Sequence, residues 1–206
     1  MLQRANNTSG DDLVTFEEFC ELVPDGQKAD LIDGEIVMAS PDTDQANDLN
    51  GFLWSLLRMY NSAKGHGGKV RGSRFACVLN EHNAPEPDVA FVTAIRSHLV
   101  ERLGMQGGPD VAVEIVSRGS RQRDTVRKRE LYEQAGVLEY WIIDPRQTRA
   151  LFLRLQDGVF QEVPISDGRF QSTVIPGFWL EVGWLFQNPL PNDYAILQTV
   201  LGESAV

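Results

Sequence analysis

The sequence feature that most constrains the fold is an almost wholly apolar segment, residues 111–116. A run of this kind predicts a strand that is covered on both faces, as strands of parallel sheets are. Residues 117–120 break the run, residues 121–134 carry a helical pattern, and Glu139–Asp144 predicts a second strand. A strand, a helix and a strand in this order predict a right-handed crossover between two parallel strands. We therefore expect an α/β (α+β) fold.

Local signals predict the other elements. Thr15 and Glu18 have the spacing of a capping box, which predicts a short helix at residues 16–23. Asp33-Gly34 predicts a hairpin turn between residues 29–32 and 35–39. The remaining expected elements are a long amphipathic helix at 47–63, strands at 69–79 and 88–93, a hairpin around Asp157-Gly158, a strand near 172–175 and a short C-terminal helix.

The length of 206 residues fits one domain with short terminal additions. We expect a frayed or disordered segment at 1–12, a single domain at 13–190 and a C-terminal helix or tail at 191–206. Cys20 and Cys77 stand far apart, so two reduced thiols are expected rather than a disulfide or zinc site. Residues 1–12 lack the apolar stretch of a signal peptide, and no apolar run reaches the length of a membrane span. These features predict a cytoplasmic protein without membrane association.

The net charge of −10 argues against a nucleic-acid partner, because phosphate binding depends on Lys and Arg. The basic residues are unevenly spread, however, and several gather between residues 118 and 129. Members of this stretch are Arg118, Arg121, Arg123, Arg127, Lys128 and Arg129. Such a stretch forms either a phosphate-binding surface or a solvated helix face, and charge alone favours the second interpretation.

Three side chains could carry chemistry. Glu114 lies within the apolar strand, where a carboxylate is costly unless it is paired or bound to a metal. Asp88 stands at the start of another strand, and the two acids could share one Mg²⁺ ion if their strands are neighbours. Lys128 shares a helix face with Leu131 and Tyr132, which predicts that it points toward the sheet. For each residue an ordinary structural role, such as a surface ion pair between Asp124 and Lys128, stays open.

Other common sites lack their patterns. The three histidines have no zinc-ligand spacing, and Ser117 and Ser120 do not form a nucleophile elbow. Gly67-Gly68-Lys69 is followed by Val70, which excludes a phosphate-binding P-loop.

The order and spacing of several segments resemble the Uma-type restriction endonuclease family, a branch of the PD-(D/E)XK superfamily. The resemblance runs from about residue 15 to 185. It is carried by Leu31-Ile32-Asp33-Gly34-Glu35, Pro87-Asp88-Val89-Ala90, Val113-Glu114-Ile115-Val116, Asp124-Thr125-Val126-Arg127-Lys128, Leu131-Tyr132-Glu133-Gln134-Ala135-Gly136 and Glu139-Tyr140-Trp141-Ile142-Ile143-Asp144-Pro145.

The resemblance implies a restriction-endonuclease-like mixed sheet flanked by helices, with a metal site at one end. Asp88, Glu114 and the peptide carbonyl of Ile115 would hold Mg²⁺ or Mn²⁺. Val116 stands where the superfamily usually has a lysine, and Lys128 would substitute for it. Supporting roles are implied for Glu35, Ser117 and Asp124. Ala29-Asp30 and Asp44 depart from the usual residues of the family, which are Tyr-Glu and His.

These observations leave three hypotheses. The first is a Mg²⁺-dependent DNA endonuclease in which Arg118, Arg121, Arg123 and Arg127 contact phosphates, with weak, salt-sensitive DNA binding and a homodimer expected by analogy. The second is a catalytically degenerate module with the same fold that binds nucleic acid or a partner protein. The third is hydrolysis of a smaller phosphoester, which an acidic chain tolerates better.

Overall fold

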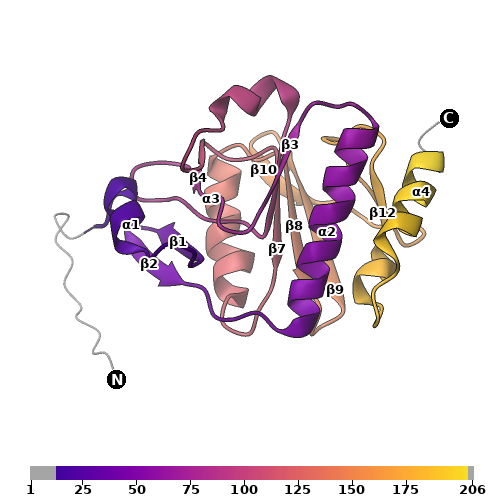
Figure 1. Cartoon of the computed structure of the whole chain (residues 1–206), viewed down its shortest axis with the longest axis horizontal. Coiled ribbons are helices and arrows are strands. Elements are labelled where there is room, and N and C mark those ends of the chain that lie inside the picture. The colour runs from indigo at the N-terminus through magenta and orange to yellow at the C-terminus, as the bar shows by residue number, and fades with distance from the viewer. Residues whose placement is uncertain (1–12, 204–206) are drawn as a thin grey trace.

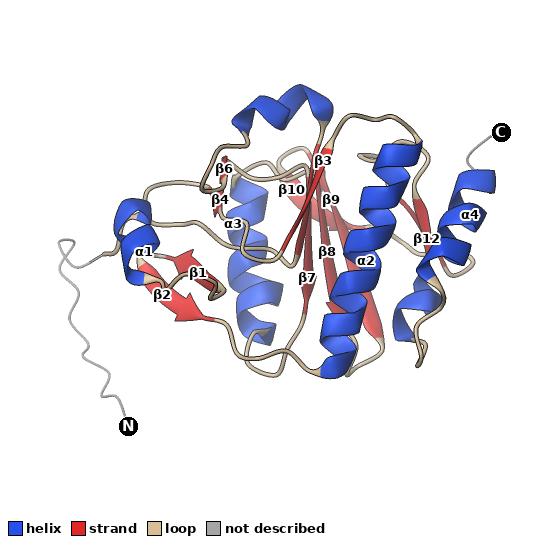
Figure 2. Cartoon of the chain, in the orientation of Figure 1, coloured by secondary structure: helices blue, strands red, loops and turns tan. Residues whose placement is uncertain are grey.

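The computed structural model describes residues 13–203, in which a mixed sheet lies between helices (Figures 1 and 2). Its six strands are, in spatial order, β10 (Val159–Glu162), β9 (Arg149–Gln156), β8 (Glu139–Asp144), β7 (Val111–Ile115), β5 (Val89–Val92) and β3 (Lys69–Gly72). Strands β7 and β8 are parallel, and the other neighbours are antiparallel. This arrangement confirms the expected fold class.

The crossover from β7 to β8 is helical, as predicted, but it is not a uniform α-helix. A π-helical segment, η2 (Arg123–Arg127), precedes α3 (Lys128–Gln134). The backbone N–H of Lys128 donates to the carbonyl of Arg123, five residues earlier. A π segment is uncommon and occurs frequently at functional sites. Here it carries Asp124 into the interior and directly precedes the buried Lys128.

Each face of the sheet has its own core. The long helix α2 (Asp44–Ala63) and the C-terminal α4 (Asp193–Glu203) lie on one side, and α3 lies on the other (Figure 1). On β7, Val113 packs with the α2 side and Ala112 packs with the α3 side. This alternation is the one predicted for a strand that is covered on both faces.

An N-terminal unit packs beside the α3 side of the sheet (Figure 1). It consists of α1 (Phe16–Leu22), β1 (Ala29–Ile32) and β2 (Glu35–Met38), with the predicted capping box and hairpin. An isolated bridge joins Leu31 of β1 to Ala84, just before β5. This bridge brings the hairpin against the start of β5.

Two sequence predictions of strands are wrong. The expected strand at 69–79 is divided into β3 and β4 (Cys77–Val78), because the chain turns between them, where Arg74 has φ 66°. β4 pairs instead with β6 (Met105–Gln106), and η1 (Ala94–Leu99) lies between β5 and β6.

Residues 172–175 form a turn rather than a strand. The hydroxyl of Ser172 accepts the N–H groups of Val174 and Ile175, so these amides cannot take part in a sheet. The strands in this region are β11 (Arg169–Gln171) and β12 (Trp179–Glu181), followed by η3 (Val182–Phe186).

Side chains of α4, including Leu197, belong to the same core as α2. The expected frayed segment at 1–12 lies outside the described residues, as do 204–206. None of the helices within 13–203 combines the length and apolar character needed to cross a bilayer.

Candidate active site

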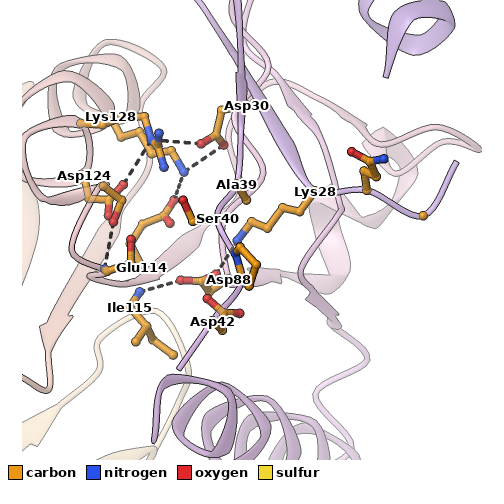
Figure 3. Close-up of a pocket in the computed structure, with 16 residues that line it drawn as sticks. Lys28, Asp30, Ala39, Ser40, Asp42, Asp88, Glu114, Ile115, Asp124 and Lys128 are labelled. Carbon is orange, nitrogen blue, oxygen red and sulfur yellow. Dashed lines mark hydrogen bonds and ion pairs between the residues drawn. The ribbon is translucent and has the colours of Figure 1, made fainter. Parts of the chain in front are cut away.

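A pocket of about 400 Å³ lies where the N-terminal hairpin, β5, β7 and η2 meet (Figure 3). The side chains with chemical function that line it are Lys28, Asp30, Ser40, Asp42, Asp88, Glu114, Ser117, Ser120, Arg123, Asp124 and Lys128, and Ile115 also contributes. The predicted residues Asp88, Glu114, Ile115, Ser117, Asp124 and Lys128 are thus gathered around one cavity.

Asp88 lies directly before β5, next to the point where β5 and β7 pair. Val89 is opposite Val113, so continuing this register places Asp88 opposite Glu114. The Oδ2 atom of Asp88 accepts the backbone N–H of Ile115 at 2.6 Å, and its Oδ1 atom accepts from the ammonium of Lys28. The carboxylate of Asp88 is therefore fixed beside Ile115, the residue next to Glu114.

Glu114 projects from β7 into the α3 side of the sheet and is 3% exposed. Its Oε1 atom accepts from Lys128 Nζ at 2.8 Å and from the hydroxyl of Tyr132 at 3.2 Å. Both donors lie on α3, one turn apart. The helix that follows β7 thus orients the acid that β7 presents.

Lys128 is 1% exposed and is surrounded by acids. Its ammonium lies 2.9 Å from Asp30 Oδ1 as well as 2.8 Å from Glu114 Oε1 (Figure 3). Burial opposes its charge, but the carboxylates of Asp30, Glu114 and Asp124 outweigh burial and raise the pKa of Lys128. The surroundings therefore favour the charged form of Lys128, and its side chain points into the protein, as the helical pattern predicted.

The acids that line the pocket outnumber its cationic side chains. Its lining contains five carboxylic acids and three cationic side chains, an excess of two negative charges when all are ionised. Burial, opposed by Lys128 and reinforced by Asp124 and Asp88, raises the pKa of Glu114 to about 8. Burial also raises the pKa of Asp124 and that of Asp42. A bound dication would offset this excess and favour the ionised acids.

The residues present fit a magnesium ion. Mg²⁺ is commonly bound by one or two carboxylates together with water and substrate phosphate. Asp88 and Glu114 could supply the two carboxylates, and Ile115 lines the same pocket. Within residues 13–203 no group of three or more His, Cys, Asp or Glu side chains is arranged to hold a metal, so the protein alone offers a sparse ligand set. The Oδ1 atom of Asp124 is buried and accepts no hydrogen bond from any described residue.

Some predicted site residues lie elsewhere. Glu35 is exposed at the start of β2 and is not among the described residues that line the pocket. Ser117 lines the pocket, but its backbone N–H makes a structural hydrogen bond to the hydroxyl of Ser120 at 3.0 Å.

The four arginines predicted to contact phosphate do not form one free surface. Arg121 is 3.5 Å from Asp144, Arg123 is 3.2 Å from Asp30, and Arg127 pairs with Asp33 and Glu130. Arg118 is exposed, and no ion pair to it is found among the described residues. Most of the positive charge in this stretch is thus neutralised within the protein.

The sequence interpretation missed Lys28 and Asp30 as site residues. Asp30 is buried in β1, and its Oδ1 atom accepts the N–H of Glu86 at 2.8 Å. A carboxylate within the apolar Ala29–Ile32 is the same anomaly that identified Glu114. Lys28 carries no comparable signal, because its position depends on how the hairpin docks beside Asp88.

Two further buried acids have structural roles outside the pocket. Glu139 accepts from Ser172, Thr173 and the indole of Trp141. Asp110 accepts from Thr93 and Arg96. These acids are satisfied by neighbours that fix loops, whereas the acids of the pocket surround a cavity.

The family model for Uma2, described as "Putative restriction endonuclease", matches residues 15–183. The chain belongs to the Uma2 family. Its fold is similar to the crystal structure of a "putative nuclease belonging to DUF820" from Anabaena variabilis, with a TM-score of 0.70 at 17% sequence identity. That likeness covers 84% of this chain and 97% of the other. No curated protein matches the chain by sequence. The resemblance inferred from the sequence motifs is thereby confirmed.

Proposed function

We propose that this Uma2 protein is a Mg²⁺- or Mn²⁺-dependent endonuclease that hydrolyses phosphodiester bonds of DNA. The observation that carries the proposal is the placement of Asp88 and Glu114 around one pocket in which acids outnumber cations. Membership of a family described as "Putative restriction endonuclease" supports the same class of reaction. The reaction, the metal and the substrate together form the proposal.

Asp88, Glu114 and the carbonyl of Ile115 would hold the metal. When bound, Mg²⁺ would polarise the scissile phosphate and lower the pKa of a nearby water. Lys128 fixes Glu114 and Asp30 and adds positive potential on the interior side of the pocket, which would stabilise charge that develops on a bound phosphate. The N–H of Ile115 holds Asp88 in a single orientation. These preformed contacts reduce the reorganisation that the reaction requires.

DNA is the proposed substrate, and we expect it to bind weakly and with strong dependence on salt. The chain carries a net charge of −10, and ion pairs occupy Arg121, Arg123 and Arg127. Arg118 is the member of the predicted phosphate-binding set that is most available to a phosphate. We also propose a homodimer, by analogy with nucleases that cut both strands of a duplex.

The test is cleavage of plasmid DNA, oligonucleotides and nucleotides with Mg²⁺ or Mn²⁺, repeated with a chelator. Wild type is compared with Asp88→Asn and Glu114→Gln. Glu139→Gln is the matched control, because Glu139 is an equally buried acid outside the pocket. We expect metal-dependent cleavage of long DNA by wild type and by the control, and a loss of at least about a hundredfold in the two site variants.

A second candidate is a catalytically degenerate module that binds nucleic acid or a partner. It is favoured by the lysine partners of Asp88 and Glu114, which balance both acids without a metal. Metal-independent DNA binding without cleavage by wild type would support it and contradict the proposed nuclease. Cleavage of nucleotides alone would instead indicate a smaller phosphoester as substrate.

A further inference from the structure

The pocket contains two lysines in contrasting surroundings (Figure 3). Lys128 comes from α3 and contacts two acids, Glu114 and Asp30, with a side chain that is 1% exposed. Lys28 comes from the segment before β1 and contacts Asp88, with a side chain that is 21% exposed. Lys128 is thus fixed in the interior, whereas Lys28 lies on the open side of the acid cluster.

The contact of Lys28 occupies the oxygen of Asp88 that does not accept the N–H of Ile115. One carboxylate oxygen, Oδ2, accepts the N–H of Ile115, and the other, Oδ1, accepts from Lys28. A divalent cation that binds through Oδ1 must therefore take the place of the ammonium. Two like charges cannot share that oxygen without strong repulsion.

We propose that Lys28 is the exchangeable counter-ion of Asp88, which leaves Asp88 when a metal binds and then contacts the phosphate of the substrate. This inference rests on the proposed metal-dependent nuclease. It assigns a catalytic role to a residue that the family motifs in this sequence do not include.

The charges of the pocket support both positions of Lys28. Without a metal, the lining has two more acids than cations, and Lys28 balances Asp88. With a dication present that excess is cancelled, and the phosphodiester brings one new negative charge. Lys28 can pair with that negative charge. Its side chain is flexible, so the ammonium can move while the backbone stays in place in the segment before β1. Lys128 cannot do so without leaving Glu114 and Asp30.

The first test is calorimetric titration of the full-length protein with Mn²⁺ alone, without DNA. Removing the competing ammonium in Lys28→Gln is expected to tighten Mn²⁺ binding by about tenfold. Lys69→Gln is the matched control, because it makes the same change in a lysine that bonds to Ser97 outside this pocket. Lys28→Arg keeps the positive charge and is expected to bind Mn²⁺ about as wild type does.

The second test is single-turnover cleavage of DNA at saturating Mn²⁺, where differences in metal affinity no longer matter. Lys28→Gln is expected to be slower than wild type by about a hundredfold, and Lys28→Arg to recover part of that rate. The inference thus predicts opposite effects of one substitution: tighter metal binding and slower cleavage. Thermal unfolding of each variant verifies that it is folded.

The outcomes separate this inference from the function on which it rests. If Asp88→Asn abolishes Mn²⁺ binding but Lys28→Gln leaves it unchanged or weaker, Lys28 is not the competing counter-ion and only this inference fails. If Lys28→Gln binds Mn²⁺ more tightly but cleaves DNA as fast as wild type, the proposed contact of Lys28 with the phosphate is contradicted. If wild type binds no Mn²⁺, the proposed metal site and this inference fail together.

Discussion

Lys128 shows how one residue can make a cluster of buried acids possible. Its ammonium lies within 3 Å of Asp30 and of Glu114, and all three side chains are buried. Taking a charge out of water is costly, and an acid that loses its buried partner keeps that cost without the compensating attraction. We therefore regard Lys128 as a condition for the fold of the site as well as for any chemistry.

Replacing Lys128 by Gln should lower the free energy of unfolding by about 3–5 kcal/mol, because two buried carboxylates lose their cation. Arg129→Gln is the matched control, since Arg129 neighbours Lys128 and its guanidinium donates to the carbonyl of Phe160 rather than to a buried acid. Urea unfolding followed by circular dichroism measures both values. Equal stability of the two variants would show that the interior ion pairs contribute little.

Glu86 predicts a specific dependence of stability on pH. Burial raises its pKa to about 7 from an ordinary 4.5, although the N–H of Ala29 donates to it. The folded state therefore binds more protons than the unfolded state between these values. The contribution of Glu86 to stability consequently falls as pH rises from about 4.5 to about 7, by at most about 3 kcal/mol.

Glu86→Gln should remove this part of the pH dependence. The measurement is the free energy of unfolding at pH 5 and at pH 8, for wild type and for the variant. Wild type should lose more stability than Glu86→Gln between the two values. An identical loss in both proteins would contradict the raised pKa.

At the scale of elements, the predicted residues that the structure brings to the pocket lie on locally encoded structure. The apolar run of β7 made Glu114 stand out, and the helical pattern of 121–134 predicted that Lys128 points toward the sheet. The positions of Asp30 and Lys28 depend instead on the bridge between Leu31 and Ala84. Residues so distant in the chain leave no periodic signal in either segment.

The arginines of the 118–129 stretch also depend on partners that are distant in the sequence, which local patterns do not reveal. Whether a basic stretch is free for phosphate depends on which acids reach it from other elements. Arg127 is neutralised in part by Asp33, which stands at the tip of the N-terminal hairpin. Arg121 lies near Asp144, at the end of β8. Composition alone could not distinguish these internal pairs from a surface that binds DNA.

Glu139 allows the two kinds of buried acid to be separated by experiment. It ties β8 to the turn at Ser172 and Thr173 through three hydrogen bonds. Glu139→Ala should lower the free energy of unfolding by about 3 kcal/mol, because the donors of the turn lose their buried acceptor. Its Mn²⁺ affinity, measured by calorimetry, should equal that of wild type. A large loss of Mn²⁺ affinity would place Glu139 functionally within the site.

For the molecule as a whole, the net charge of −10 determines how strongly it is attracted to or repelled by a polyanion. Long-range repulsion weakens the encounter with DNA, and only local cations can counter it. Because most arginines of the 118–129 stretch are paired internally, few phosphates can be neutralised. The affinity for DNA should then depend on a small number of exposed side chains.

Arg118→Gln should reduce the slope of log K against log salt concentration by about 1, because one phosphate contact is lost. Arg127→Gln should change the slope less, since Asp33 and Glu130 already occupy Arg127. Fluorescence anisotropy at several salt concentrations, with a chelator to prevent cleavage, gives both slopes. A larger effect at Arg127 would mean that its ion pairs open when DNA binds.

The parallel pairing of β7 with β8 requires the chain to pass through α3 before the sheet can be completed. During synthesis, Asp30, Asp88 and Glu114 therefore emerge ahead of Lys128, whose ammonium pairs with Asp30 and Glu114. Enclosing those acids without it is unfavourable, so they stay hydrated on a growing chain. A ribosome-bound fragment that stops short of the crossover helix would consequently lack the assembled acid cluster, and the proposed nuclease activity would be delayed until that helix has been made.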